Sequence, residues 1–481
     1  MMPTKRIYAS LVLILLYLGT AAQEIIISEE INVKNDFSYE IIGWSNGETL
    51  LFRDKVLRYD ILAYDADLVF KWSKEVTFEK KKINIIGFVK GEDNFTVVYH
   101  FRDRNDVYVL SRKFDAEGDE IAGDTLFVDE NTFKTPRYFM EVSADNKKLL
   151  IVEAEKDNEL TLFSIDLDSL ELLWGRSIDL DNRDQKNELL QVIMSPDGVV
   201  YIIMDKNNTW SKRRSHAIEI RSYSQDQRNK LSIPVRDVLT YDVKFQFSPI
   251  NDALQGIMSY TEKSDNRTKG IIFMNATSDL SDSFQKYQTT FDDKLLQDIY
   301  GKDVPRKKGL KDLTVRHLQP RMDGGIVALL ELSKEYSRRP SFPASTTSGY
   351  GSRRWVDYYF EDVIAYSFHP DGELHWNDVL HKRQYSQDDD AVYSSFFVFQ
   401  LPSSLRIIFN DEIRNENTVS EYLLTGRGLE KRNSLMSTDY QGLKLKFREA
   451  IQISPHEILV PSQRSGRLNL VKVRYSTTTR S

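Results

Sequence analysis

The chain has 481 residues, of which 41% are hydrophobic and 28% charged, and this globular composition excludes wholesale disorder and a polytopic membrane protein. It contains no cysteine, which excludes a disulfide scaffold, a thiolate metal site and a cysteine nucleophile. The formal net charge of −7 indicates no broad basic surface, so we expect no nucleic-acid partner.

The first 22 residues have the three-part pattern of a secretory signal peptide. Lys5 and Arg6 precede an uncharged, mostly apolar run over 7–18, and the small residues Gly19–Ala22 follow. An uncleaved membrane anchor is the alternative, but a helix that spans a bilayer needs about 20 apolar residues. No second long apolar run follows. We therefore expect cleavage after Ala22 and a mature chain over 23–481 that is not integral to the membrane.

Short runs rich in β-branched and aromatic residues dominate the rest of the chain and predict an all-β fold. Clear examples are 85–89, 148–152 and 199–204, and most such runs have Asp, Asn, Gly or Ser close by. Long amphipathic stretches with a helical period are nearly absent. The best helical segment is 291–300, FDDKLLQDIY, whose acidic residues come early, where the helix dipole stabilises them.

One sequence phrase recurs along the chain: an apolar strand, a turn that contains Asp, and a second strand that ends near Trp. It reads ILAYDADLVFKW at 61–72, LFSIDLDSLELLW at 162–174 and AYSFHPDGELHW at 365–376. A second hairpin phrase, such as IMSPDGVVYIIM at 193–204, usually precedes it. Two hairpins make four strands, and four-stranded units at this spacing are typical of a β-propeller. Counting the third strands predicts eight blades, with these strands near 64, 108, 162, 218, 272, 364, 422 and 470.

The last of these phrases reaches the end of the chain without a fourth strand, whereas Glu24–Ile31 is an apolar strand that precedes the first full blade. We therefore predict a single β-propeller of eight four-stranded blades over 23–481, in which the N-terminal strand completes the last blade. Such closure removes open sheet edges, which would otherwise pair non-specifically. Seven blades, or two β-sandwich domains, are the alternatives.

Two family resemblances rest on these phrases. The phrase with Asp or Gly shortly before Trp, kept at Trp72, Trp174 and Trp376, resembles the repeats of pyrroloquinoline-quinone-like and WD40-like propellers. The run 376–411 is similar to a stretch of uncharacterised secreted propeller-like proteins of Bacteroidota. The shared elements are Trp376, Lys382, Gln384, Ser386, Asp388–Asp390, Tyr393–Ser395, Asn410 and Asp411. The second resemblance implies a secreted propeller and supplies no reaction.

The repeat spacing stretches at the sixth blade, where we predict insertions at about 291–314 and 333–358. The first carries the cations Lys302, Arg306, Lys307, Lys308 and Lys311. Long loops in compact domains are often functional, and Arg, Tyr and Trp dominate the hot spots of protein interfaces. The second insertion therefore predicts a partner-binding site made of Arg338, Arg339, Tyr350, Arg353, Arg354, Trp355 and Tyr358. A solvated loop tip is the alternative. Arg and aromatic residues also suit a glycan, and the sequence does not choose between glycan and protein.

No motif for catalysis, a metal or a cofactor is visible in the sequence. His369, His375 and His381 are spaced by six, but 370–372 predicts a turn between the first two, so we expect no metal site. The segment 179–190 starts like a calcium loop yet lacks its glycine and its final glutamate, and Asp388–Asp390 suits a solvated turn better than a calcium site. We predict no catalytic residues and no cofactor.

A signal peptide without cysteine favours export to a bacterial periplasm, the outer-membrane surface or the exterior. We expect a non-catalytic propeller that binds a protein or a cell-envelope component, either alone or as a subunit of an outer-membrane-associated assembly. The alternative is a propeller enzyme that acts on glycans or uses a quinone cofactor, with its site over the central channel. Acids, His and Arg converging at one mouth of the ring would favour the enzyme.

Overall fold

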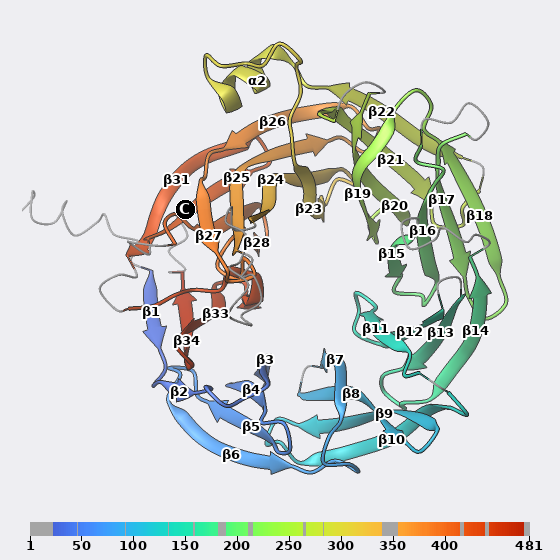
Figure 1. The fold of residues 1–481 in the computed structure, drawn as a ribbon, viewed down its shortest axis with the longest axis vertical. Helices are drawn as coiled ribbons and strands as arrows, with labels where there is room; N and C mark the ends of the chain where they lie inside the picture. Colours follow the sequence, from blue (N-terminus) through green and yellow to red (C-terminus); the bar gives the residue numbers. More distant parts are fainter. Residues whose placement is uncertain are drawn as a thin grey trace, which may run out of the picture.

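The structure is a computed structural model that describes residues 23–475 except 46, 92, 133, 157–158, 181–188, 210–214, 263–265, 282, 339–354, 414–417 and 438–441. Eight antiparallel four-stranded sheets, two of them with one short extra strand, stand in a ring around a central channel (Figure 1). The fold is therefore an eight-bladed β-propeller. The predictions of an all-β fold and of eight blades are confirmed, and seven blades and two sandwiches are excluded.

The first four blades follow one another along the chain, and each runs from the channel outward. Blade 1 consists of β3 (Ser38–Ser45), β4 (Glu48–Asp54), β5 (Tyr59–Tyr64) and β6 (Phe70–Val76). Blade 2 consists of β7 (Asn84–Lys90), β8 (Asn94–Asp103), β9 (Asp106–Asp115) and β10 (Glu120–Asp129). Blade 3 consists of β11 (Arg137–Val142), β12 (Lys148–Lys156), β13 (Glu159–Asp166) and β14 (Leu172–Asp179). Blade 4 consists of β15 (Leu189–Met194), β16 (Val200–Lys206), β17 (Ala217–Tyr223) and β18 (Arg228–Pro234).

The remaining blades include the two insertions and the ring closure. Blade 5 consists of β19 (Leu239–Ser248), β20 (Ala253–Thr261), β21 (Thr268–Thr277) and β22 (Phe284–Thr290). Blade 6 consists of β23 (Leu313–Pro320), β24 (Ile326–Arg338), β25 (Trp355–Phe368) and β26 (Leu374–Leu380), and β27 (Gln384–Gln387) also pairs with β25. Blade 7 consists of β28 (Phe397–Leu401), β29 (Ser404–Asn410), β30 (Thr418–Thr425) and β31 (Gly428–Ser437). Blade 8 consists of β32 (Ile451–Ser454), β33 (Glu457–Arg464), β34 (Arg467–Arg474) and β1 (Glu24–Ile27).

Hydrophobic clusters between neighbouring blades hold the ring together. Every pair of neighbours shares one cluster, which gives eight inter-blade clusters among the described residues. Every residue of β5 and of β20 is buried, because a middle strand packs against a neighbouring blade on both of its faces. The near-continuous apolar runs in the sequence are these middle strands.

The N-terminal strand closes the ring as predicted. β1 pairs with β34 from Glu24↔Arg474 to Ile27↔Val471 and forms the outermost strand of blade 8. The predicted strand over Glu24–Ile31 is interrupted at Ser28, where the backbone N–H of Leu470 donates to Ser28 Oγ instead of to a carbonyl. Pairing resumes at β2 (Ile31–Asn32), which also lies against β34. Backbone hydrogen bonds and apolar packing thus close the ring without a disulfide.

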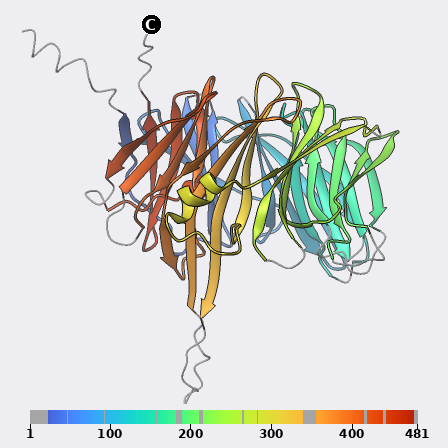
Figure 2. The same ribbon diagram turned by 90° about the horizontal axis from the view of Figure 1, so that it is seen from above.

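The two faces of the ring differ in the length of their connections. One face, the turn face, carries short turns such as 65–69, 116–119 and 321–325. The opposite face, the loop face, carries the connections between blades and those between second and third strands, including 291–312 and 381–396. The hairpin of β24 and β25 projects from the loop face, whereas β1 begins and β34 ends on the turn face (Figure 2). Function-bearing loops are therefore expected on the loop face.

The recurring Trp has a structural role between blades. Trp72 of β6 lies against the turn of blade 2, where a Cβ added to Gly118 would meet Trp72 Cη2 at 2.9 Å. Trp376 of β26 donates from Nε1 to the carbonyl of Gly426 in the turn of blade 7, at 3.1 Å. The outer strand of one blade thus covers the turn of the next, which explains why the phrase ends near an aromatic residue.

The predicted helix is confirmed as α2 (Asp293–Tyr300). Asp292 caps it, since Asp292 Oδ1 accepts from the backbone N–H of Leu295 at 2.8 Å. Leu295 and Leu296 are buried in the cluster between blades 5 and 6 and anchor the first insertion there. Among the described residues, no helix is long and apolar enough to cross a membrane.

Candidate functional site

The two insertions, which are separate in the sequence, frame one hollow on the loop face. This insertion hollow has a volume of about 580 Å³ and lies between α2, the segment 305–312 and the base of the β24–β25 hairpin. Cationic, aromatic and acidic side chains line it, namely Arg267, Tyr300, Lys311, Lys334, Tyr336, Tyr359, Glu361 and Asp362. The fold of blade 6 brings the insertions together, because 291–312 leads from β22 of blade 5 into β23 of blade 6, and β24 and β25 are the middle strands of the same blade.

The register of the hairpin sorts its side chains onto two faces. Cross-strand partners share a face, and the pairs are Lys334↔Tyr359, Tyr336↔Asp357 and Arg338↔Trp355. The face that carries Tyr336 and Trp355 therefore continues from the insertion hollow toward the tip of the hairpin. These two side chains are 51% and 40% exposed, which is high for residues of their size.

The residues of the predicted partner-binding site fall into three groups. Trp355 is on the exposed face of the hairpin. Tyr358 lies on the opposite face, is 8% exposed, and packs with Phe360 and Ala391. The backbone of Arg338 pairs with Trp355 at the end of β24. The other four residues, Arg339, Tyr350, Arg353 and Arg354, lie outside the described residues.

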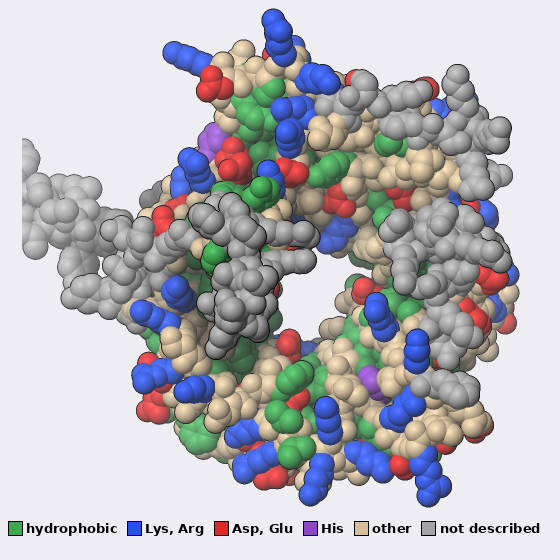
Figure 3. All heavy atoms as spheres, viewed as in Figure 1, with side chains coloured by type: hydrophobic (Ala, Val, Ile, Leu, Met, Phe, Trp, Pro, Cys, Tyr) green, Lys and Arg blue, Asp and Glu red, His purple; other side chains and the backbone are tan. Residues whose placement is uncertain are grey.

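Cations gather beside the insertion hollow. Lys302, Arg306, Lys307, Lys308 and Lys311 of the first insertion are all exposed. Lys308 pairs with Asp293 in the first turn of α2. In Figure 3, Lys and Arg side chains crowd the upper edge of the loop face, where Figure 1 shows α2. This rim gives the hollow a positive border.

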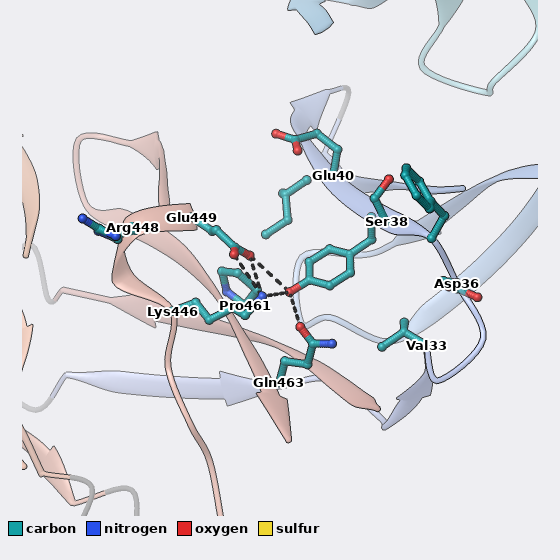
Figure 4. Close-up of a pocket in the computed structure, with 12 residues that line it drawn as sticks. Val33, Asp36, Ser38, Glu40, Lys446, Arg448, Glu449, Pro461 and Gln463 are labelled. Atoms are coloured by element: carbon teal, nitrogen blue, oxygen red, sulfur yellow. Dashed lines mark hydrogen bonds and ion pairs between the residues drawn. The ribbon is translucent and has the colours of Figure 1, made fainter. Parts of the chain in front are cut away.

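A second hollow lies on the loop face at the seam where the N-terminal segment closes the ring. This seam pocket has a volume of about 500 Å³ and lies between blades 8 and 1 (Figure 4). It is lined by the segment 36–41 with Val33, and by Lys446, Arg448, Glu449, Pro461 and Gln463. Glu449 ends the short 3-10 helix η3 (Phe447–Glu449) that precedes blade 8.

Hydrogen bonds converge on Tyr39 inside the seam pocket. Lys446 Nζ donates to Tyr39 Oη at 2.9 Å and to Glu449 Oε1 at 2.9 Å. Tyr39 Oη lies 3.2 Å from Glu449 Oε2 and 3.1 Å from Gln463 Oε1, and its single hydrogen can serve only one of these acceptors at a time. Burial and the nearby Glu449 raise the pKa of Tyr39, so its hydroxyl remains a donor.

The carboxylate of Glu40 is the unpaired group of the seam pocket. No described residue forms a hydrogen bond or an ion pair with its side chain, whereas Glu449 is paired with Lys446 and Asp36 with Arg53. The Glu40 side chain is open to solvent within the pocket, but partial desolvation by the pocket walls and the neighbouring Glu449 raise its pKa. This pocket could not be predicted from the sequence, because residues about 400 positions apart form it and no local motif marks them.

The run 376–411 forms a buried hydrogen-bond network between blades 6 and 7. Gln384 Nε2 donates to the carbonyls of Ser395 and Asn410, and Gln384 Oε1 accepts from the backbone N–H of Ser395 and from Lys382 Nζ. Lys382 Nζ also lies 2.7 Å from Glu331 Oε1, and both side chains are almost fully buried. Elements of the resembling stretch therefore hold two blades together, which is a structural role.

The candidate metal ligands have other partners. Asp389 Oδ1 accepts from Ser386 Oγ and from the backbone N–H of Ala391, as a turn-forming aspartate does. The rings of His369 and His375 are tilted against each other with centroids 4.4 Å apart, across the turn that the sequence predicts, and His381 faces Asp362 instead. Across the part of the chain that the structure describes, no three His, Asp or Glu side chains are arranged to hold a metal. Residues 181–188 of the calcium-like segment lie outside it.

Comparisons with known proteins found similarity to solved structures alone. No family profile and no curated protein sequence match this chain. The solved propeller of Dos1 is 10% identical with a TM-score of 0.44, and the match covers 93% of this chain and 94% of that one. An uncharacterised protein of Listeria monocytogenes is 11% identical with a TM-score of 0.40, over 84% and 98% of the two chains. The β-propeller domain of the Trilobed protease from Pyrococcus furiosus is 12% identical with a TM-score of 0.33, over 86% and 98%. At these values the likenesses carry no functional information.

Proposed function

We propose that this protein is an exported, non-catalytic propeller that binds a protein or a cell-envelope component through the insertion hollow and the exposed face of the β24–β25 hairpin. The observation that carries the proposal is the meeting of both insertions at one place on the loop face. Export is supported by the sequence pattern of residues 1–22 alone.

The chemistry of this surface suits a macromolecular partner. Tyr336 and Trp355 offer large apolar areas, and the exposed cations of the first insertion form a polar rim. Aromatic anchors inside a polar rim are the usual anatomy of a protein interface. Interface hot spots of this kind typically cost 2 kcal/mol or more when truncated, roughly thirtyfold in affinity.

The test is affinity purification from native membranes with purified variants as bait. The double variant Tyr336→Ala/Trp355→Ala should lose the partner that the wild-type protein captures, and replacement of 338–355 by a short Gly-Ser turn should do the same. The matched control is Leu172→Ala/Leu173→Ala, which removes two side chains of 45% and 40% exposure from the start of β14 on the turn face. Equal capture by wild type, both site variants and control would refute this site.

An enzyme over the channel stays a second proposal. What supports it is the gathering of Glu40, Glu449 and Arg448 at the loop-face end of the innermost strands, together with an open channel in Figure 3. A carboxyl of raised pKa beside a carboxylate is the arrangement that glycoside hydrolysis uses. Hydrolysis of a glycan that disappears in Glu40→Gln would favour it, and binding without turnover would argue for the first proposal.

A further inference from the structure

The seam pocket is independent of the insertions and has binding chemistry of its own. It combines hydrogen-bond acceptors, donors and aromatic surface in one cavity of about 500 Å³. That volume lies within the roughly 300–1,000 Å³ of small-molecule sites. The contacts among Lys446, Tyr39 and Glu449 join blade 8 to blade 1 and so have a structural role in closing the ring. The exposed Phe37 and the unpaired Glu40 are not explained by this role.

Two side chains of the seam pocket, Phe37 and Glu40, make no contact that would stabilise the fold among the described residues. Phe37 at the rim is 78% exposed. A ligand that covers this phenyl ring removes apolar surface from water, which favours binding. Glu40 is a carboxylate at the pocket wall with no partner among the described residues. The carbonyl of Gln463 is left without the Tyr39 hydrogen whenever Glu449 accepts it. The pocket thus offers acceptors beside an open aromatic face.

The charges of the pocket decide which class of ligand fits. The face of the Tyr39 ring, which a cation would use, is already occupied by Lys446 Nζ at 5.2 Å from the ring centroid. An anion would be repelled by the unpaired Glu40 and by Glu449. An uncharged molecule with many hydroxyls meets neither penalty, since each hydroxyl can donate to a carboxylate and accept from a cation.

We infer that the seam pocket binds a neutral sugar residue, with Phe37 against the face of the sugar ring and Glu40 accepting hydrogen bonds from its hydroxyls. Arg448 lines the same pocket, and Figure 4 shows its guanidinium away from Lys446 and Gln463. Its Nη1 donates to the carbonyl of Ala391 at 3.4 Å and its guanidinium lies over the Phe360 ring, so Lys446 is the cation that faces the cavity. The inference does not depend on the partner-binding proposal, because the insertion hollow lies at blades 5 and 6.

The test uses the full mature chain on an array of neutral oligosaccharides, followed by calorimetry with the strongest binder. Phe37→Ala should weaken that binding about tenfold, and Glu40→Gln by tenfold or more. Both residues are exposed, so the variants should keep the melting temperature of the wild type. Phe70→Ala, which removes a 47% exposed phenyl ring on the turn face, is the matched control and should bind within about twofold of wild type.

Three results would overturn the inference. Wild-type protein that binds no neutral oligosaccharide refutes the ligand class. Binding that survives both Phe37→Ala and Glu40→Gln places the sugar elsewhere. Displacement of the sugar by lysine or by inorganic phosphate shows a site for charged ligands. The Gly-Ser replacement of 338–355 should leave sugar binding unchanged, so failure of the partner-binding proposal is distinguishable from failure of this one.

Discussion

The Lys382–Glu331 pair gives a sharp prediction for the stability of the ring. We expect Lys382→Met to lower the free energy of unfolding by about 3 kcal/mol, at the low end of the cost of breaking a buried ion pair. Lys382 Nζ lies 2.7 Å from Glu331 Oε1, and both side chains are at most 1% exposed, so the variant leaves a carboxylate in the interior. Methionine has a similar length and leaves no large cavity. The loss is not larger because Arg316 Nε and Ser395 Oγ still donate to Glu331 Oε2, each at 2.8 Å.

The assay is urea unfolding at pH 7, with Lys148→Met as the matched control. Lys148 Nζ donates at 2.8 Å to the carbonyl of Pro196 rather than to a carboxylate, so its replacement should cost only about 1 kcal/mol. Adding Glu331→Gln to Lys382→Met should recover about 2 kcal/mol, because the buried charge is then gone. Equal losses for the two lysine variants, or additive losses in the double variant, would show that the pair carries no special free energy.

Two further predictions concern pH and a turn. Burial lowers the pKa of His317 in the folded protein to about 4, so the unfolded chain takes up a proton at this side chain first as the pH falls. The stability that comes from keeping His317 neutral is therefore complete above about pH 6.5 and is lost between pH 6.5 and pH 4. His317→Gln should therefore show a smaller loss of stability than wild type, by about 2 kcal/mol, between pH 7 and pH 4.5 in thermal melts, and parallel curves would contradict this. Gly118→Ala should lower the free energy of unfolding by more than the about 1–2 kcal/mol that a left-handed backbone costs a residue with a side chain. The φ of Gly118 is +74°, and the new Cβ would also meet Trp72. The matched control is Gly47→Ala, because Gly47 has a φ of +80° and an added Cβ would meet no atom within 4 Å. Equal melting temperatures of the two variants would show that the Trp72 contact does not matter.

Much of the fold could be predicted because its signals are local. Alternation and turn residues mark each hairpin within a dozen positions, and all eight third strands fall where the repeated phrase places them. The acidic residues at the start of 291–300 predict helix α2. Ring closure followed from strand counting, since Glu24–Ile31 lacked a partner and the last blade lacked a strand. The break at Ser28 was not predictable, because it depends on which atom of β34 lies opposite.

The sites divide differently between sequence and tertiary structure. The sequence alone determined the propeller class, the number of blades, the closing strand and the two places where the repeat is interrupted, because each follows from periodicity along the chain. It did not reveal that both interruptions frame one hollow with Tyr336 and Trp355 on its side. Nor did it reveal the seam pocket, where Lys446 meets Tyr39 across 407 positions. Side chains so far apart become neighbours only when the ring closes, so long-range pairing, rather than any local pattern, determines where the two hollows form.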